Sequence, residues 1–378
     1  MPAIGATTAV EAIEDLLVRA VAFGASDIHI DPEVDGIRVR MRVDGLLRQT
    51  GTLPMRLHAE SIARLKILSG ARTDVHAVPQ DGRWRADVSG STYNIRASFM
   101  PSYHGENAVL RLLPISGSMG IVSLADLGFS SDHIASLDRA CRQSSGLILV
   151  AGPTGSGKTT TLRACLAKQA EEPVSIMTLE DPVEYEIPGV RQIYVRHEHG
   201  VTFAGALRAA LRQDPDIIMV GEIRDGETAR VAIHTALTGH LVLSTIHTNS
   251  ALEAVPRLID MGVDPYLLAS TLSLVVGQRL IRTICPSCAG MGAAVQEYQH
   301  DAARCGICHS TGWKGRSVIA EVLSIDLALK SLIHRKASLD ECAAAARDAG
   351  FVDMGVDGAD KVACGMTTGL EVRRVLTT

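Results

Sequence analysis

The segment SGLILVAGPTGSGKTTTL, residues 145–162, decides how the larger part of this chain folds. It opens with an apolar run of strand length, Gly146 to Val150, passes through a glycine-rich stretch and ends in a sequence typical of a helix. This order predicts a loop whose backbone N–H groups surround a phosphate at the positive end of the helix. We expect Lys158 to reach the β- and γ-phosphates and the Thr159 hydroxyl to complete the shell of a Mg²⁺ ion.

The predicted nucleotide contacts lie in this loop and in the first turn after it. A glycine-rich turn without a ligand is the plainer interpretation, but eight positions match a phosphate-binding loop and both flanks agree with it. Nucleotide binding is therefore the first function that the sequence predicts. The predicted binding residues are Gly152, Pro153, Thr154, Gly155, Ser156, Gly157, Lys158, Thr159 and Thr160.

Length and composition limit the classes of protein that fit. The chain has 378 residues, which exceeds one typical core and predicts two domains with appendages. Hydrophobic residues make up 46% of it and charged residues 21%, which is enough apolar material for globular folding. The net charge of −5 argues against a generally basic nucleic-acid-binding protein, so we expect no direct contact with nucleic acid, although a local basic face would be compatible.

The sequence predicts a cytoplasmic chain. Its N-terminus carries Glu11, Glu14 and Asp15 among apolar residues and has no basic region before an apolar run, unlike a signal peptide. The longest stretch without Asp, Glu, Lys or Arg, residues 231–252, contains three histidines and several threonines, whereas a membrane span would be more uniformly apolar.

Residues 1–113 are predicted to form a smaller α+β domain. Apolar residues recur at helical spacing near the N-terminus, and a short strand follows at 26–30. Ile37 to Val43 alternates apolar residues with arginines between Asp-Gly turns, which predicts a hairpin with one apolar and one cationic face. We expect a second helix over about 55–68, further strands near 83–88, 93–99 and 108–112, and a linker at 114–123.

Residues 124–284 alternate predicted helices with strands, which indicates an α/β domain with a mainly parallel sheet. In such sheets ligands bind at the carboxyl ends of the strands. Residues 285–308 carry paired cysteines, and residues 309–378 are predicted to be a helical region, with helices from Leu327 and a turn-rich loop near 355–358. The expected strands are 146–150, 174–178, 217–220 and 241–244.

Two acidic segments follow predicted strands. LEDPVEY, residues 179–185, holds three carboxylates. Considered alone, the segment would be interpreted as a solvated acidic loop. Because it follows a strand of a nucleotide domain, we expect it to face the phosphates and to orient water or the metal ion. DPDIIMVGE, residues 214–222, is an apolar strand ending in Glu222, where a phosphate-loop ATPase often has Asp. This difference favours a water-positioning role for Glu222 over direct metal ligation.

Two histidines flank another apolar strand, TGHLVLSTIHTN, residues 238–249. A single histidine is usually a structural group whose hydrogen bonds are satisfied. At the end of a sheet strand, next to Ser244 and Thr245, we expect His240 to sense the γ-phosphate. For His247 both the structural and the functional interpretation stay open.

Four of the eight cysteines form two CxxC pairs, Cys285 with Cys288 and Cys305 with Cys308, separated by sixteen residues. This spacing is typical of a tetrahedral Cys₄ Zn²⁺ site, and because all four positions would be protein ligands the site should be structural. A redox pair or chance spacing is the alternative.

Arginines are frequent in the first domain. Exposed strand faces explain most of them, yet a phosphate-loop domain commonly receives a cationic group from another domain or subunit to neutralise transition-state charge. Some of Arg83, Arg85, Arg96 and Arg111 are candidates for that group.

Taken together, these motifs resemble the secretion ATPase superfamily that powers type II secretion and type IV pilus assembly. The resemblance covers nearly the whole chain and implies a RecA-like phosphate-loop domain, ATP with Mg²⁺, and a ring-shaped homohexamer in which each first domain leans on a neighbour's nucleotide domain. The motifs that carry it are SDIHIDP, RVDG, PQDGR, the glycine loop, TLEDPVEY, ALRAALRQDPDIIMVGEIRD, TALTGHLVLSTIHTN, QRLIRTICPSC and DGADKVACGMTTGLEV.

The resemblance also implies roles for single residues. Glu184 falls on the general base and Glu222 on the second acid. His240 and His247 fall on the histidine box, and Arg96 and Arg111 on the arginine fingers, while Arg208 and Arg212 match positions implicated in contacts between domains. Larger members carry a further N-terminal domain that docks on a membrane partner, whereas this sequence starts at the domain before the ATPase.

The predicted function is a motor that passes domain movement around residues 114–123 to an inner-membrane platform protein, so any membrane association is peripheral and through partners. A retraction motor is the first alternative, but the cysteine pairs resemble the assembly branch, and an AIRNLIRE-like motif of the retraction branch is not found. A nucleic-acid translocase is disfavoured by acidic balance and 3% aromatic content. The presence of both Glu184 and Glu222 disfavours a non-catalytic zinc scaffold that only retains nucleotide.

Overall fold

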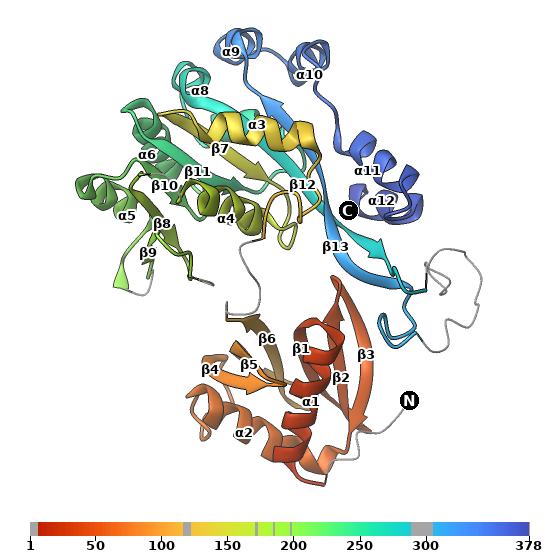
Figure 1. Cartoon of the computed structure of the whole chain (residues 1–378). Coiled ribbons are helices and arrows are strands. Elements are labelled where there is room, and N and C mark those ends of the chain that lie inside the picture. The colour runs from red at the N-terminus through yellow and green to blue at the C-terminus, as the bar shows by residue number, and fades with distance from the viewer. Residues whose placement is uncertain are drawn as a thin grey trace. The chain divides into compact units, whose positions relative to one another are not determined.

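The computed structural model describes residues 7–115, 122–170, 173–183, 186–196, 199–288 and 305–377. They form two compact units, one comprising residues 1–120 with 285–315 and the other residues 121–284 with 316–378 (Figure 1). Residues 116–121 of the predicted linker lie outside the described residues, so a hinge there stays a prediction. Within the described ranges, no helix combines the length and apolar character needed to cross a bilayer.

The first unit contains a six-stranded sheet in the order β3-β2-β1-β6-β5-β4, with antiparallel neighbours throughout. This agrees with the predicted α+β domain. Its elements are α1 (Ala9–Phe23), β1 (Ala25–Glu33), β2 (Gly36–Val43), β3 (Leu46–Leu53), a 3₁₀ turn (Met55–Leu57), α2 (His58–Ser69), β4 (Gln80–Val88), β5 (Ser91–Ser102) and β6 (Gly105–Pro114).

Helix α1 shows why this unit forms a core on one face of its sheet. Thr8 and Glu11 form a capping box at its start, and Gly24 ends it in the left-handed conformation with φ 67°. The apolar stripe of α1 that contains Ile13, Leu16 and Ala20 is buried in one cluster with inward-facing strand residues.

The arginines of β2 lie on the face opposite this core, as predicted. Carboxylates of β1 lie beside them. Arg40 is 2.8 Å from Asp31, and Arg38 is 2.9 Å from Glu33. The predicted cationic face is therefore partly neutralised. The sequence did not reveal this, because register between β1 and β2 decides which side chains meet.

The second unit contains a seven-stranded sheet in the order β13-β12-β7-β11-β10-β8-β9. The pairings from β12 through β7, β11, β10 and β8 to β9 are parallel, as predicted. The strands are β7 (Gly146–Ala151), β8 (Ile176–Glu180), β9 (Arg191–Tyr194), β10 (Ile217–Val220), β11 (Leu241–Ile246), β12 (Leu272–Ile284) and β13 (Trp313–Ser324).

Helices cover both faces of this sheet, so its central strands are buried on both sides. In β7, Leu147 and Leu149 belong to one apolar cluster and Ile148 and Val150 to the other. This explains the uninterrupted apolar run in the sequence. The helices are α3 (Ser131–Cys141), α4 (Lys158–Gln169), α5 (Phe203–Ala210), α6 (Gly226–Leu237), α7 (Ala254–Asp260), α8 (Pro265–Thr271), α9 (Leu327–His334), α10 (Leu339–Asp348), α11 (Met354–Ala363) and α12 (Gly369–Leu376); a 3₁₀ turn spans Leu211–Gln213.

The C-terminal helices begin at Leu327, as predicted, but residues 309–378 are not helical throughout, because β13 occupies Trp313–Ser324. The expected loop near 355–358 is also wrong. Helix α11 spans these residues, and the Asp353 side chain caps it. Gly358 serves close packing, because a Cβ there would lie 2.6 Å from Val372 of α12. The two long strands β12 and β13 were not among the predicted strands.

Candidate functional site

The glycine-rich loop joins β7 to α4, which is the predicted strand, loop and helix. Gly155 and Gly157 have φ angles of 80° and 87°, and α4 begins at Lys158. Gly152, with φ 152°, has no room for a side chain, because a Cβ would lie 2.5 Å from Ser156 Oγ and 2.7 Å from the carbonyl of Gln278. The glycines therefore allow the tight loop at the helix N-terminus that a phosphate requires.

Lys158 lies across this loop and is nearly buried. Its Nζ donates hydrogen bonds to the carbonyls of Gly152, at 2.8 Å, and Pro153, at 2.9 Å. Burial lowers the pKa of Lys158 to about 8, although the charge of Glu222 acts in the opposite direction. The ammonium is thus held over the loop in an environment that would favour a phosphate group as its counter-ion.

Glu222 and His247 reach the same place from neighbouring strands. Glu222 follows β10, and its carboxylate lies 2.6 Å from Arg224 and 3.6 Å from Nε2 of His247, which follows β11. Burial lowers the pKa of His247, and the positive charge of Lys158 lowers it further. Because β10, β11 and β7 are parallel, their carboxyl ends bring Lys158, Glu222 and His247 together.

Two hydroxyls tie the ends of these strands to one another. Ser244 Oγ donates to the Val220 carbonyl at 2.7 Å, and Thr245 Oγ1 donates to the Gly221 carbonyl at 2.8 Å. These bonds position the backbone that carries Glu222. They also give Ser244 and Thr245 a structural role.

His240 lies at the amino end of β11, away from the carboxyl ends of the strands. The expectation that it senses the γ-phosphate is therefore wrong. It precedes β11, and its backbone carbonyl accepts from Gly146 at the start of β7. Its Nδ1 lies 3.2 Å from the Thr235 carbonyl. A six-residue strand separates His240 from His247, and at about 3.3 Å per residue this is roughly 20 Å. His240 therefore has a local structural role, whereas His247 lies near Lys158.

The acidic segment 179–185 begins at the end of β8. Its first carboxylate is buried, and its last one lies outside the described residues. Glu180 is buried and accepts hydrogen bonds from Arg163 at 2.9 Å and Thr178 at 2.7 Å, so it holds β8 to α4. Asp181 is exposed directly after the strand. Glu184, the expected general base, lies outside the described residues.

Gln278 on β12 contacts the phosphate loop and was missed by sequence reasoning. Its fully buried side chain donates to the Ser156 carbonyl at 2.8 Å and accepts from Thr161 of α4 at 2.9 Å. It therefore holds both the loop and the helix. A polar residue inside an apolar strand is the sequence signal that could have identified it.

A hollow of about 400 Å³ lies beside the phosphate loop. The segment after β11 forms one wall through His247 and Asn249, and α7 adds further polar residues. Gly152 and Pro153 of the loop also line this hollow, so the hollow adjoins the loop. Its lining residues are Gly152, Pro153, His247, Thr248, Asn249, Glu253, Pro256, Arg257 and Asp260.

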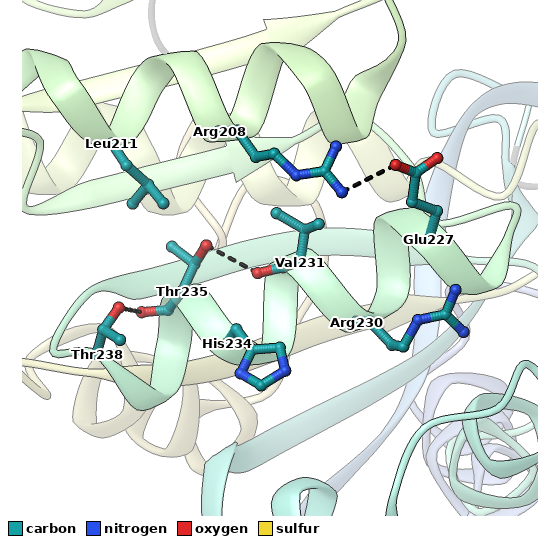
Figure 2. Close-up of a pocket in the computed structure, with 8 residues that line it drawn as sticks. All are labelled: Arg208, Leu211, Glu227, Arg230, Val231, His234, Thr235 and Thr238. Carbon is teal, nitrogen blue, oxygen red and sulfur yellow. Dashed lines mark hydrogen bonds and ion pairs between the residues drawn. The ribbon is translucent and has the colours of Figure 1, made fainter.

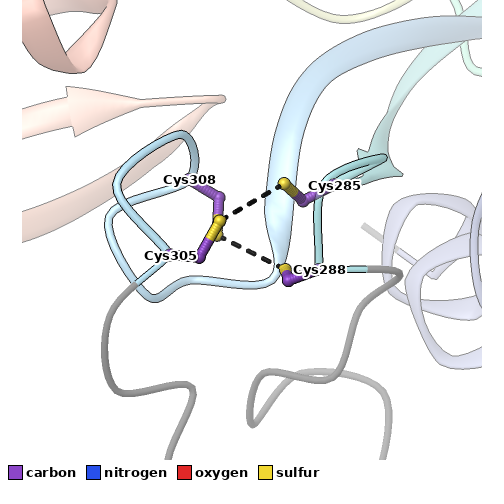
Figure 3. A group of neighbouring side chains, drawn as sticks. All are labelled: Cys285, Cys288, Cys305 and Cys308. Atoms are coloured by element: carbon purple, nitrogen blue, oxygen red, sulfur yellow. Dashed lines mark hydrogen bonds between the residues drawn. The ribbon is translucent and has the colours of Figure 1, made fainter.

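The four cysteines of the CxxC pairs lie together (Figure 3). Their sulfur atoms are all within 4.8 Å of one another, with Cys285 3.9 Å from Cys305 and Cys288 3.7 Å from Cys308. A tetrahedral zinc ion with Zn–S bonds of about 2.3 Å requires sulfur separations of about 3.8 Å, so this cluster fits such an ion.

The comparisons with known proteins decide the family. A family model described as "Type II/IV secretion system protein" matches residues 4–374. The chain belongs to the type II secretion ATPase family. The type II secretion system protein HxcR of Pseudomonas aeruginosa is 46% identical, with 96% of this chain and 76% of the relative covered. The type II secretion system ATPase E of Vibrio cholerae is 41% identical, with 97% and 75% covered.

Solved structures agree with the fold of this secretion ATPase. The pilus retraction motor PilT with bound ADP is 26% identical, has a TM-score of 0.67 and covers 96% of both chains. The Legionella pneumophila ATPase DotB is 22% identical with a TM-score of 0.73 over 100% of this chain and 97% of its own. The predicted family and fold are confirmed.

The arginines of this secretion ATPase's first unit form a row across its sheet. Register places Arg83 opposite Arg96, Arg96 opposite Arg111, and Arg111 opposite Asp27. Arg111 is 2.8 Å from Asp27 and 60% exposed. Like charges directly opposite one another destabilise a sheet, and within the described residues Asp27 is the carboxylate that pairs with this row.

Arg208 lies on α5, where it lines a hollow of about 710 Å³ between α5 and α6 (Figure 2). It reaches Glu227 of α6 at 2.9 Å, and both side chains are 54% exposed. Arg212 donates to the Arg208 carbonyl at 3.1 Å. Among the described residues that line this hollow none belongs to the phosphate loop, so Arg208 lies on a different surface from the nucleotide site.

Proposed function

We propose that this secretion ATPase hydrolyses Mg²⁺-bound ATP at the loop 152–160 and that the energy drives assembly of pilin-like subunits at an inner-membrane platform protein. The observation that carries the proposal is the convergence of Lys158, Glu222 and His247 at the carboxyl edge of the parallel sheet. The relatives named for type II secretion support the same function.

Each residue has a distinct task in this proposal. The loop amides and Lys158 hold the terminal phosphates, and the Thr159 hydroxyl offers a ligand to Mg²⁺. Glu222, connected to His247, orients water near the γ-phosphate, and Glu184 acts as the general base that the family resemblance implies. Mg²⁺ would neutralise charge on the phosphates when bound.

The proposed assembly is a homohexamer in which Arg96 and Arg111 of one subunit complete the nucleotide site of its neighbour. Their row on an exposed sheet face supports this, because a cation from a neighbouring subunit can stabilise the transition state without occupying the site beforehand. The four-cysteine cluster would hold a structural Zn²⁺ ion.

A retraction motor is the alternative with an observation in its favour, since PilT shares the fold at 26% identity. The secretion relatives at 41% to 46% identity outweigh it.

The proposal is tested by Lys158→Ala, with Lys168→Ala as the matched control on the same helix. Lys168 is half-exposed and contacts Asp138 at 2.6 Å, away from the loop. We expect Lys158→Ala to lower the ATPase rate at least about 100-fold, because transition-state charge loses its cation, and Lys168→Ala to retain the wild-type rate. Matching circular dichroism spectra would show that both variants fold. Full turnover in Lys158→Ala would refute the assignment.

A further inference from the structure

A buried carboxylate, Glu321 on β13, connects the segment beside the phosphate loop with the C-terminal helix α11. The side chain is only 4% exposed. Its Oε1 accepts from the Ala251 amide at 2.5 Å, and its Oε2 accepts from the Met354 amide at 3.3 Å. Ala251 belongs to the segment 247–253 between β11 and α7, and Met354 is the first residue of α11. One carboxylate therefore bonds the backbones of two distant segments.

The surrounding residues make room for this carboxylate. A Cβ on Gly277 of β12 would lie 2.7 Å from Oε1 and 2.8 Å from Cγ of Glu321, so a side chain there would displace it. Burial raises the pKa of Glu321, whereas the amides of Ala251 and Met354 and the nearby charge of Arg279 act in the opposite direction. Since an unsatisfied buried carboxylate is costly, these partners are a condition for its presence in the core.

The segment that Glu321 holds is part of the candidate nucleotide site. It carries His247, which lies 3.6 Å from Glu222, and it walls the hollow beside the loop. From the other side, Arg279 of β12 donates to the Asn249 carbonyl at 3.0 Å. The position of His247 thus depends on two buried charged side chains, Arg279 and Glu321.

Helix α11, whose Met354 amide bonds Glu321, is also hydrogen-bonded to β13. Asp357 accepts from the Ala320 amide at 2.8 Å and pairs with Lys361 at 2.7 Å. A shift of α11 along β13 would therefore change the geometry at Glu321 as well.

We propose that Glu321 is a positioning residue that couples α11 to the segment carrying His247, so that the C-terminal helices influence the hydrolysis step. The proposal rests on the ATPase function proposed above. Glu321 acts through the Ala251 amide, and among the described residues its hydrogen bonds go to Ala251 and Met354 and not to the loop 152–160. Its loss should lower kcat and leave the nucleotide KM unchanged.

Glu321→Gln tests the connection while keeping the shape of the side chain. The amide group replaces one acceptor oxygen with a donor, so one of the two backbone amides loses its partner. We expect kcat to fall about fivefold or more, KM to stay within about twofold, and hydrogen exchange of residues 249–253 to accelerate about tenfold. Glu106→Gln is the control, because it makes the same change at a buried carboxylate of the first unit that pairs with Lys66 and His76.

A second pair of variants isolates the α11 side. Met354→Pro removes the amide donor at the first helical position, where proline is tolerated, whereas Met354→Ala keeps the amide and loses the same packing. We expect faster exchange of 249–253 and lower kcat in the proline variant only. Wild-type exchange in Glu321→Gln, or equal acceleration in Glu106→Gln or Met354→Ala, would overturn the coupling. Hydrogen exchange can be measured in a protein that does not hydrolyse ATP. A wild-type protein without ATPase activity would therefore refute the proposed function, while the exchange data would still test the coupling.

Discussion

At the scale of single residues, the site depends on charges whose pKa values are shifted by their surroundings. Lys158 is nearly buried, and two loop carbonyls accept from its ammonium group. Burial lowers its pKa to about 8, which is within reach of ordinary assay conditions. A bound phosphate would restore a higher pKa, because an anion favours the charged form.

This shift predicts that nucleotide affinity depends on pH. Below about pH 8 Lys158 is already charged, so affinity should be constant; above it the free protein must take up a proton to bind, and the dissociation constant should rise by up to about tenfold per pH unit until the pKa of the complex is reached. Calorimetric titration with ADP from pH 7 to 9.5 measures this. The weaker binding of Lys158→Ala should vary far less over this range, and a flat wild-type profile would contradict the prediction.

At the scale of elements, β12 and β13 serve several sites at once. Near the phosphate loop they supply Gln278 and Glu321, and beyond their ends lies the cysteine module. Within the first unit this module touches α1, since the rings of His309 and Phe23 meet edge to face at 4.3 Å. The cysteine cluster is therefore placed to stabilise the turns at the far ends of two strands that also shape the nucleotide site.

Removing one ligand should test the metal at this cluster. We expect Cys288→Ser to lose the single equivalent of zinc per chain that wild type should carry, because three thiolates leave the tetrahedral shell open. Cys364→Ser, which alters an exposed cysteine outside the cluster, should keep it. Elemental analysis of the purified proteins gives the zinc content. A wild-type protein free of zinc, or equal zinc in both variants, would argue against the site.

At the scale of the whole molecule, the proposed ring requires one subunit to complete another subunit's site. Arg111 and Lys158 belong to different units of the chain, and the arginine row lies on a sheet face of the first unit. If the arginines act between subunits, a defect in either residue should be complemented by a partner with the opposite defect.

Mixing variants tests this arrangement. Arg111→Ala and Lys158→Ala should each have low ATPase activity, whereas a mixture should regain a measurable fraction, because some interfaces pair an intact loop with an intact arginine. Arg40→Ala, which removes a similar ion pair with Asp31 on the same sheet, should stay active alone. Mixtures that stay as inactive as their components, under conditions where subunits exchange, would count against an arginine acting in trans.

The sequence by itself determined the features that depend on local spacing. The strand, the glycines at positive φ and the start of the helix lie within one short segment, so residues 145–162 predicted this loop geometry correctly. The CxxC pairs predicted the cysteine cluster because each turn directs two thiols to one point. Alternation of apolar and polar residues likewise identified strands of the first sheet, and short apolar runs between predicted helices identified central strands of the second sheet.

Only the tertiary structure decided which distant residues meet. A histidine beside an apolar strand can lie at either end of it, and the parallel register placed His240 at the edge away from the loop and His247 beside Glu222. Gln278 and Glu321 act on the loop region from strands far along the chain. Their roles arise from strand order and burial, which are long-range properties that no short segment encodes.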